Sequence, residues 1–281
     1  MTLSLQMADL FITFFLLVFL WLLAAYQKKA LLALTLLFSI FLSIEYFKII
    51  PGNKEALLGY TKFLSVSLLG LCVLVGFSVF SAEKKEKYLK PFVTYIHIAI
   101  IFNILMMVFV PSYDTLRSPF IKASCLVLAL WLFTQMAKKN FQTVSFDNQI
   151  FLFNASPLSW ILCHSLYRLG LITLPIFDLR RYFFLELLSL SFMASFYLLQ
   201  KKRHKIACYF GIADTLAVSF LAFIGKALDF YGDTNKPSVT FDFKSETLDL
   251  VVIPMQIMVV LVGVFFIIKN LKELAFLKKK G

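Results

Sequence analysis

The chain has 281 residues, of which 60% are hydrophobic and 33 are phenylalanine. A soluble domain cannot bury so much apolar surface, so lipid must be the solvent for much of this protein. The formal net charge of +12 would suggest a nucleic-acid partner in a soluble protein, but these basic residues stand at the ends of apolar runs, where they signal membrane topology. We therefore expect an all-α, polytopic transmembrane helical bundle whose partner is the lipid bilayer, not nucleic acid.

Nine apolar segments follow one another, each close to the ~20 residues that a helix needs to cross a bilayer. The first has no Lys or Arg before it, so we expect a membrane helix and not a cleavable signal peptide. The alternative count is eight, if one short segment only enters the membrane. Connections are short, so we expect a single bundle over 1–281. The segments are 8–26, 30–47, 56–80, 91–110, 119–137, 158–177, 182–199, 206–228 and 249–268.

The basic residues alternate between the two sides of these segments. Connections after odd-numbered segments, together with the C-terminal tail, carry seventeen Lys and Arg, whereas the opposite side carries seven, among them Arg117. Cytoplasmic connections are the ones enriched in Lys and Arg. The asymmetry predicts nine crossings, with the N-terminus outside and the C-terminus in the cytoplasm, and we interpret Arg117 as a topology signal.

Two longer connections break the pattern. Residues 138–157 are expected in the cytoplasm, and their five Phe and Val among polar residues predict an interfacial segment on the membrane surface. Residues 229–248 form the predicted outer loop. We expect a solvated loop there, and the alternation of Val239, Phe241 and Phe243 allows the alternative of a short strand that covers the mouth of the bundle as a lid.

Arg168 stands in the middle of segment 158–177, about 15 Å from either end, where a guanidinium needs a partner or water. Asp214 lies about 12 Å from the same predicted boundary, so depth makes it the first candidate partner. Asp214 also shares a stripe of small residues that predicts a protein-facing position. His164 lies one turn before Arg168 on the same helical face.

Two further polar positions follow from the same depth comparison. Glu186 is expected about 6 Å below the outer boundary, where Arg180, Arg181 or Arg168 could pair with it. Glu45 and Lys62 are expected at equal depth on consecutive segments, about 8 to 9 Å below the outer surface. We interpret this second pair first as a structural ion pair.

Known catalytic and cofactor patterns are mostly missing. The sequence has no HExxH, GxSxG or Walker-type motif, so an enzyme is disfavoured but not excluded. Its four cysteines, Cys72, Cys125, Cys163 and Cys208, lie singly inside apolar segments and predict neither disulfides nor a zinc site. His97 and His164 match in depth and are the only candidates for haem ligation, but we expect no cofactor and no metal.

The C-terminal third carries short motifs: YRLGL at Tyr167 to Leu171, GIAD at Gly211 to Asp214, Ile253-Pro254 and a closing IIKNLKEL. In these motifs the chain resembles a broad group of bacterial multi-pass membrane proteins without an assigned activity. Members tend to carry a Gly-Asp pair after the arginine, where this chain has Tyr182 to Glu186. The resemblance implies a bacterial cytoplasmic (inner) membrane protein and adds no chemistry.

Three functional hypotheses remain open from the sequence. The first is transport or binding of a small solute, ion or proton by Arg168, Asp214, Glu186 and His164. The second is a structural or sensory membrane subunit, in which the Arg168 to Asp214 pair fixes helix register, working with a membrane-protein partner or as a homo-oligomer. The third is a membrane enzyme or haem protein.

Overall fold

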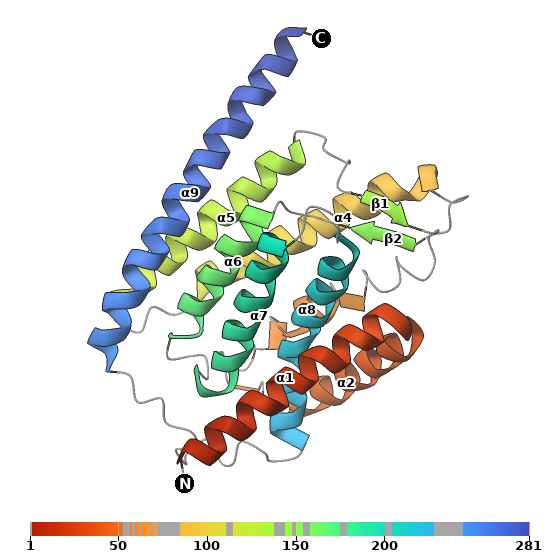
Figure 1. Ribbon diagram of the computed structural model, residues 1–281, viewed down its shortest axis with the longest axis vertical. Helices are drawn as coiled ribbons and strands as arrows, with labels where there is room; N and C mark the ends of the chain where they lie inside the picture. Colours follow the sequence, from red (N-terminus) through yellow and green to blue (C-terminus); the bar gives the residue numbers. More distant parts are fainter. Residues whose placement is uncertain are drawn as a thin grey trace. The chain divides into compact units, whose positions relative to one another are not determined.

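The computed structural model describes most of the chain, in stretches separated by short gaps. Within them the chain is all-α apart from one small hairpin, as predicted (Figure 1). The described residues are 2–49, 51–52, 57, 60–61, 63–68, 70–71, 85–110, 115–137, 144–147, 150–153, 158–174, 179–199, 204–227 and 244–280. Their elements are α1 (Thr2–Tyr26), α2 (Lys28–Ile49), α4 (Lys85–Leu105), the 3-10 helix η2 (Met106–Phe109), α5 (Ser118–Ala137), β1 (Val144–Asp147), β2 (Ile150–Phe153), α6 (Leu158–Leu171), α7 (Leu179–Leu199), α8 (His204–Ala227) and α9 (Ser245–Lys280).

Four stretches of the described helices are long and apolar enough to cross a membrane. They are Met7–Tyr26, Lys28–Lys48, Ser118–Ala137 and Ser245–Phe276. Their Leu, Phe, Ile and Val residues point outward as well as inward, which suits a lipid solvent. Helices that could cross a membrane are thus a property of this fold, whereas nine crossings and their orientation stay predictions.

The bounds of two helices differ from the predicted segments. The predicted segment 158–177 is helical only to Leu171, because α6 closes in a turn in which the amide of Thr173 donates to the carbonyl of Gly170 at 3.0 Å. Pro175 comes next but one in the sequence, and the residue before a proline disfavours helix. In contrast, α9 extends past the predicted segment 249–268 at both ends, over 36 residues or about 54 Å.

The chain divides into two compact units, so the single bundle over 1–281 stays a prediction. The first unit contains 1–79, 178–192 and 200–242, and the second contains 80–177, 193–199 and 243–281. We describe each unit by itself.

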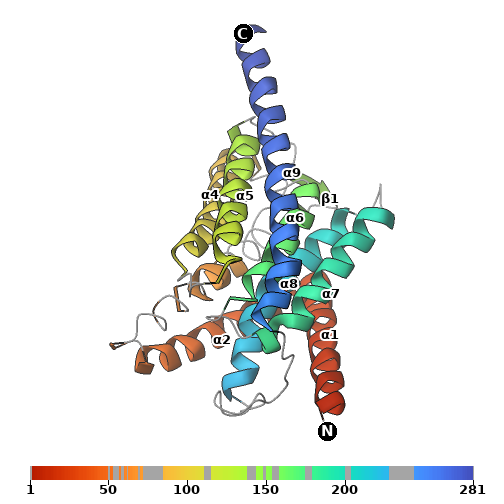
Figure 2. The same ribbon diagram turned by 90° about the vertical axis from the view of Figure 1, so that its left-hand side faces the viewer.

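In the second unit, α5 and α9 lie side by side and run parallel (Figures 1 and 2). Ser124 donates to the carbonyl of Gln256, and Asn270 donates to Thr134, both at 3.1 Å, so numbering rises together along the two helices. In contrast, α6 runs antiparallel to α5, since Trp160 donates to the Leu128 carbonyl at 2.9 Å while Thr173 meets Arg117. These directions are the ones that alternating crossings require inside this unit.

The predicted interfacial connection 138–157 contains a β-hairpin. Strands β1 and β2 pair antiparallel, with Val144 opposite Phe153 and Asp147 opposite Ile150. Two residues separate the strands, the shortest common hairpin connection, but Asn148-Gln149 is not one of the usual turn pairs. The sequence therefore did not predict the hairpin. The predicted strand at Val239 to Phe243 lies outside the described residues.

Candidate functional site

The best-defined polar site of the second unit is a buried clamp around Arg117. Arg117 directly precedes α5, and its side chain donates to Asp249 Oδ1 at 2.8 Å and to Ser245 Oγ at 3.0 Å, both on the first turns of α9. The same guanidinium donates to the hydroxyl of Thr173 at 3.0 Å and to its carbonyl at 2.7 Å, just after α6. One side chain thus ties the ends of three helices together.

This clamp gives Arg117 a packing role that its interpretation as a topology signal did not include. Its side chain is only 4% exposed, and a charge so deeply buried is stable only when it is paired and hydrogen-bonded. The planar guanidinium meets both requirements, because four of its donors are used by Asp249, Ser245 and Thr173. The clamp is therefore a structural site that holds its charge already neutralised.

Further polar contacts follow the clamp along α5 and α9, towards the C-terminal ends of these helices. Gln256 is fully buried and donates from Nε2 to the carbonyl of Leu166 on α6 at 3.1 Å. Gly170 leaves room for this amide, since a Cβ there would collide with the Gln256 side chain. On α9, Asp249, Gln256, Gly263 and Asn270 recur every seven residues, the spacing of a helix-packing seam. The seam fixes the register of the two helices.

The first unit contains a different set of polar residues, among them three carboxylates on α1, α7 and α8. Glu186 on α7 is 3% exposed and Asp9 on α1 is 2% exposed, although both helices are otherwise mostly apolar. Ser189, one turn after Glu186, is also buried and donates to Asp214 Oδ1 on α8 at 2.6 Å. We call Asp9, Glu186 and Asp214 the carboxylate cluster.

One ring contact joins α1 to α7. Phe14 stacks on Phe192 with the centroids 6.2 Å apart. Asp9 precedes Phe14 by about 7.5 Å along its helix, and Glu186 precedes Phe192 by about 9 Å. Both carboxyl-bearing residues therefore lie on the N-terminal side of this contact.

The face of α8 that is buried is not the predicted one. Gly211 and Asp214 are half-buried, and a Cβ on Gly211 would meet no atom of the described residues within 4 Å. The small-residue stripe therefore does not make the expected close approach at Gly211. Packing is done by the adjacent face, which carries Phe210, Ala213, Leu216, Ala217 and Phe220. Asp214 still meets protein, through Ser189.

Arg168 and His164 belong to the second unit, whereas Asp214 and Glu186 belong to the first, so their proposed pairing stays a prediction. Arg168 is half-buried and lies in the last turn of the 14-residue α6, not in the middle of a span. A cation at the last turn interacts favourably with the helix dipole. The helix dipole therefore explains why a charged residue is stable at this position. Counting residues along 158–177 could not show this, because it does not reveal where the helix ends.

The two candidate haem ligands also lie in the second unit. His97 is buried on α4, and the ring of half-buried His164 stacks on Trp160 with centroids 4.9 Å apart and planes within 8°. Among the residues that the structure describes, no three His, Cys, Asp or Glu side chains are grouped for metal binding. Haem ligation by His97 and His164 remains a prediction.

Of the expected pair of Glu45 and Lys62, the structure describes only Glu45. Glu45 accepts a hydrogen bond from Lys48 Nζ at 2.6 Å, three residues further along α2, in an ion pair that is largely exposed. Lys62 lies outside the described residues. A local partner within the same helix is the simplest way to satisfy a boundary carboxylate.

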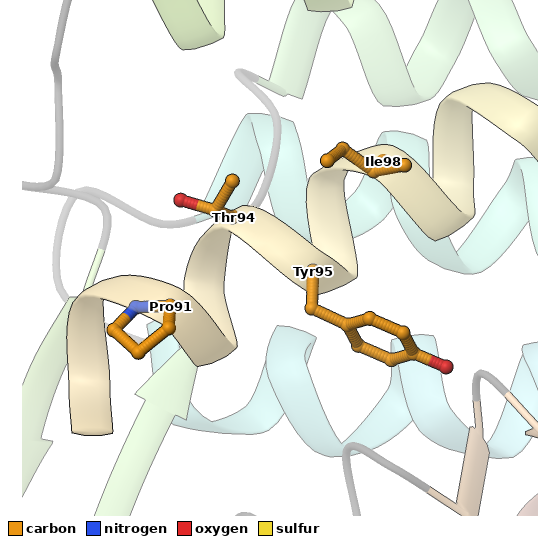
Figure 3. A pocket seen from close by; sticks show the side chains of 4 residues that line it. All are labelled: Pro91, Thr94, Tyr95 and Ile98. Carbon is orange, nitrogen blue, oxygen red and sulfur yellow. The ribbon is translucent and has the colours of Figure 1, made fainter.

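An open apolar groove of 480 Å³ lies along α4 and is lined by Pro91, Thr94, Tyr95 and Ile98. Thr94 and Ile98 follow one edge of the helix, and the Tyr95 ring follows the other (Figure 3). Tyr95 and Ile98 are exposed, as side chains facing lipid would be. The groove holds no charged group and suggests no chemistry.

Comparison with protein-family models, with curated proteins and with solved structures finds no match for this chain.

Proposed function

We propose that this chain is an integral protein of the bacterial cytoplasmic membrane and that it binds and passes protons through the carboxylate cluster. The observation that carries the proposal is the burial of Glu186, at 3% exposure, beside the Ser189 to Asp214 hydrogen bond. Carboxyl groups inside apolar helical bundles are costly to keep and are a recurring feature of proton relays. The resemblance to bacterial multi-pass proteins supports the choice of membrane.

The cluster has the elements that a proton relay needs. A carboxyl group can take up and release a proton, and a hydroxyl can both donate and accept. Ser189 donates its proton to Asp214 at 2.6 Å, and Glu186 lies one turn earlier on the same helix. Asp9 lies on α1, which contacts α7 through Phe14 and Phe192. The proposal takes the order of proton transfer as Asp9, Glu186, Ser189 and Asp214.

The second candidate is a structural or sensory subunit without transport. It is favoured by the Arg117 clamp and the contacts of Gln256 and Asn270, in which the polar groups are used for helix packing. Both candidates can hold for one chain, with the second unit as the scaffold. The two candidates differ in the role of the carboxylate cluster. A proton transporter needs it to carry protons, whereas a purely structural protein needs it only for folding.

Proton flux into proteoliposomes distinguishes the two candidates. Purified protein is reconstituted with a pH-sensitive dye trapped inside, and a pH gradient is imposed. We expect wild-type vesicles to acidify faster than empty ones. Glu186→Gln should slow the flux by about a hundredfold, the usual loss when a proton-transferring side chain is removed. Asp214→Asn should also slow it, since the amide keeps an acceptor for Ser189 but cannot carry the proton.

Glu45→Gln is the matched control, because it removes a half-buried carboxyl that Lys48 already pairs with. It should leave the flux unchanged. Wild-type vesicles no faster than empty ones would contradict the proposal, as would an intact, well-folded Glu186→Gln protein with wild-type flux. Either result would favour the structural candidate.

A further inference from the structure

The hydrogen bonds between α5 and α9 fix how far α9 extends beyond its neighbour. Asn270 pairs with Thr134, and α5 ends at Ala137, three residues later. The corresponding position on α9 is Glu273, so Leu274 to Lys280 continue past the end of α5 by about 10 Å. Helix α5 has 20 residues, or about 30 Å, which matches the hydrocarbon layer. The last turns of α9 therefore reach the headgroup layer.

This end of α9 is basic and faces away from the core of its unit. Lys269 and Lys272 are exposed, whereas Asn270 is buried against α5. At about 100° per residue, positions 269, 272, 276, 279 and 280 fall on one side of the helix, and four of these are lysine. Phe276, in the middle of that side, is exposed. Lysines around an exposed aromatic residue are typical of a membrane-interface surface.

We propose that this side of α9, formed by Lys269, Lys272, Phe276, Lys279 and Lys280 and here called the basic end, binds the headgroups of anionic phospholipids. The phosphate and glycerol oxygens accept hydrogen bonds from the lysines, and Phe276 lies between them at the membrane interface. The choice of a lipid over an acidic protein rests on register. The hydrogen bond to α5 places Phe276, Lys279 and Lys280 past the end of α5, at headgroup depth, and Lys272 level with its last turn. Lys269 starts about 6 Å inside that end, a distance that a long lysine side chain spans to the headgroups. The inference is independent of the carboxylate cluster.

A local fluorescence measurement tests this proposal. Phe276→Trp places a fluorescent tryptophan inside the basic end. Its fluorescence is obtained by subtracting the fluorescence of the wild-type protein, which has three tryptophans of its own. The protein is reconstituted in phosphatidylcholine vesicles with a trace of headgroup spin-labelled phosphatidylglycerol or phosphatidylcholine. We expect spin-labelled phosphatidylglycerol to quench the fluorescence of the introduced tryptophan more strongly than spin-labelled phosphatidylcholine does. This difference should become smaller at high salt, which screens the lysines. Replacing Lys269, Lys272, Lys279 and Lys280 by Gln should lower that preference at least about fivefold, since each lysine near an anionic surface contributes about that factor.

The matched control replaces four lysines elsewhere, Lys48, Lys54, Lys236 and Lys244, and should keep the preference. Exchange of the four basic-end lysines for Arg should also keep it, which separates lost charge from lost folding. An unchanged preference in the four-Gln variant would overturn the proposal and leave the basic end for an acidic protein partner. Equal losses in both four-Gln variants would overturn it too, because the effect would then be one of net charge alone.

Discussion

Arg117 and Lys48 each form one ion pair, at 2.8 and 2.6 Å, in very different surroundings. The Arg117 side chain is 4% exposed and the Lys48 side chain is 62% exposed. Exposed pairs of this kind contribute little to stability because water and salt screen them. A buried pair that loses one partner leaves an uncompensated charge behind.

Arg117→Ala should therefore destabilise the protein by about 3–5 kcal/mol, because Asp249 stays behind with its charge. Arg117→Lys should be intermediate, since lysine keeps the charge but cannot span Asp249, Ser245 and Thr173 at once. Thermal unfolding of the purified protein in detergent measures both. Lys48→Ala serves as the control, with an expected change below about 1 kcal/mol. An Arg117→Ala protein as stable as wild type would show that the clamp is dispensable.

Two glycines give a second contrast at the residue scale. A Cβ on Gly263 would collide with the side chain of Val127 on α5, and a β-branched neighbour has few rotamers in which to move away. Gly263→Ala should cost about 1–3 kcal/mol in thermal unfolding. Gly211→Ala, where the added methyl has space, should be neutral or stabilising by up to about 1 kcal/mol. The opposite order of stabilities would refute the α5–α9 packing.

The Arg117 clamp could not be found from the sequence because its partners are 56 and 132 residues away. The comparison of depths uses only the distance of a residue from the predicted membrane boundary. Because Arg117 was predicted at that boundary, no buried partner was sought for it. Glu186 was found because a carboxylate inside an apolar segment is conspicuous in any sequence. Asp9 was missed because it begins the first segment, where a charge is expected to meet water.

At the scale of helices, apolar length predicted where eight of the elements lie but not where they end. Hydropathy does not register that α6 stops before Pro175 or that α9 continues for several turns beyond its apolar part. The face that a helix buries was equally out of reach for α8, because its small residues and its bulky ones both recur at helical spacing. The face that a helix buries depends on its contacts with other helices, and these contacts join residues that are far apart in the sequence.

The contact of Thr134 with Asn270 offers a prediction about the α5–α9 seam. A double-mutant cycle with Thr134→Val and Asn270→Leu should give a coupling free energy of about 0.6 kcal/mol, the average for a hydrogen bond between membrane helices. Thermal or denaturant unfolding of the four proteins supplies the values. Ser191, whose hydroxyl donates within its own helix α7, provides a control through Ser191→Ala with Asn270→Leu, which should show no coupling. Coupling of the same size in both cycles would contradict a direct contact.

At the scale of the whole chain, the directions of the helices within the second unit agree with alternating crossings. Parallel α5 and α9 place Arg117 and Ser245 at one end and the C-terminus at the other. Composition predicted the membrane class, and four of the described helices are long and apolar enough to cross a bilayer. The number of crossings depends on segments of intermediate hydropathy, for which only the distribution of charges offers guidance.

Reporter fusions test the predicted orientation. With nine crossings, a fluorescent protein that folds only in the cytoplasm should glow when it is fused after Gly281. A phosphatase that is active only outside should work when it is inserted at Gly52, a turn glycine with a φ of 80° after α2. The reverse pattern, or activity of the phosphatase after Gly281, would rule out the nine-crossing topology.

If Glu186 exchanges protons inside the membrane, as proposed, it should react with dicyclohexylcarbodiimide. This apolar reagent modifies protonated carboxyl groups within bilayers, and mass spectrometry of the treated proteoliposomes identifies the modified residue. We expect modification of Glu186 with parallel loss of proton flux, and none at Glu45, which is paired with Lys48 near the surface. Unmodified Glu186 with undiminished flux, or complete modification of Glu186 without any loss of flux, would contradict the claim.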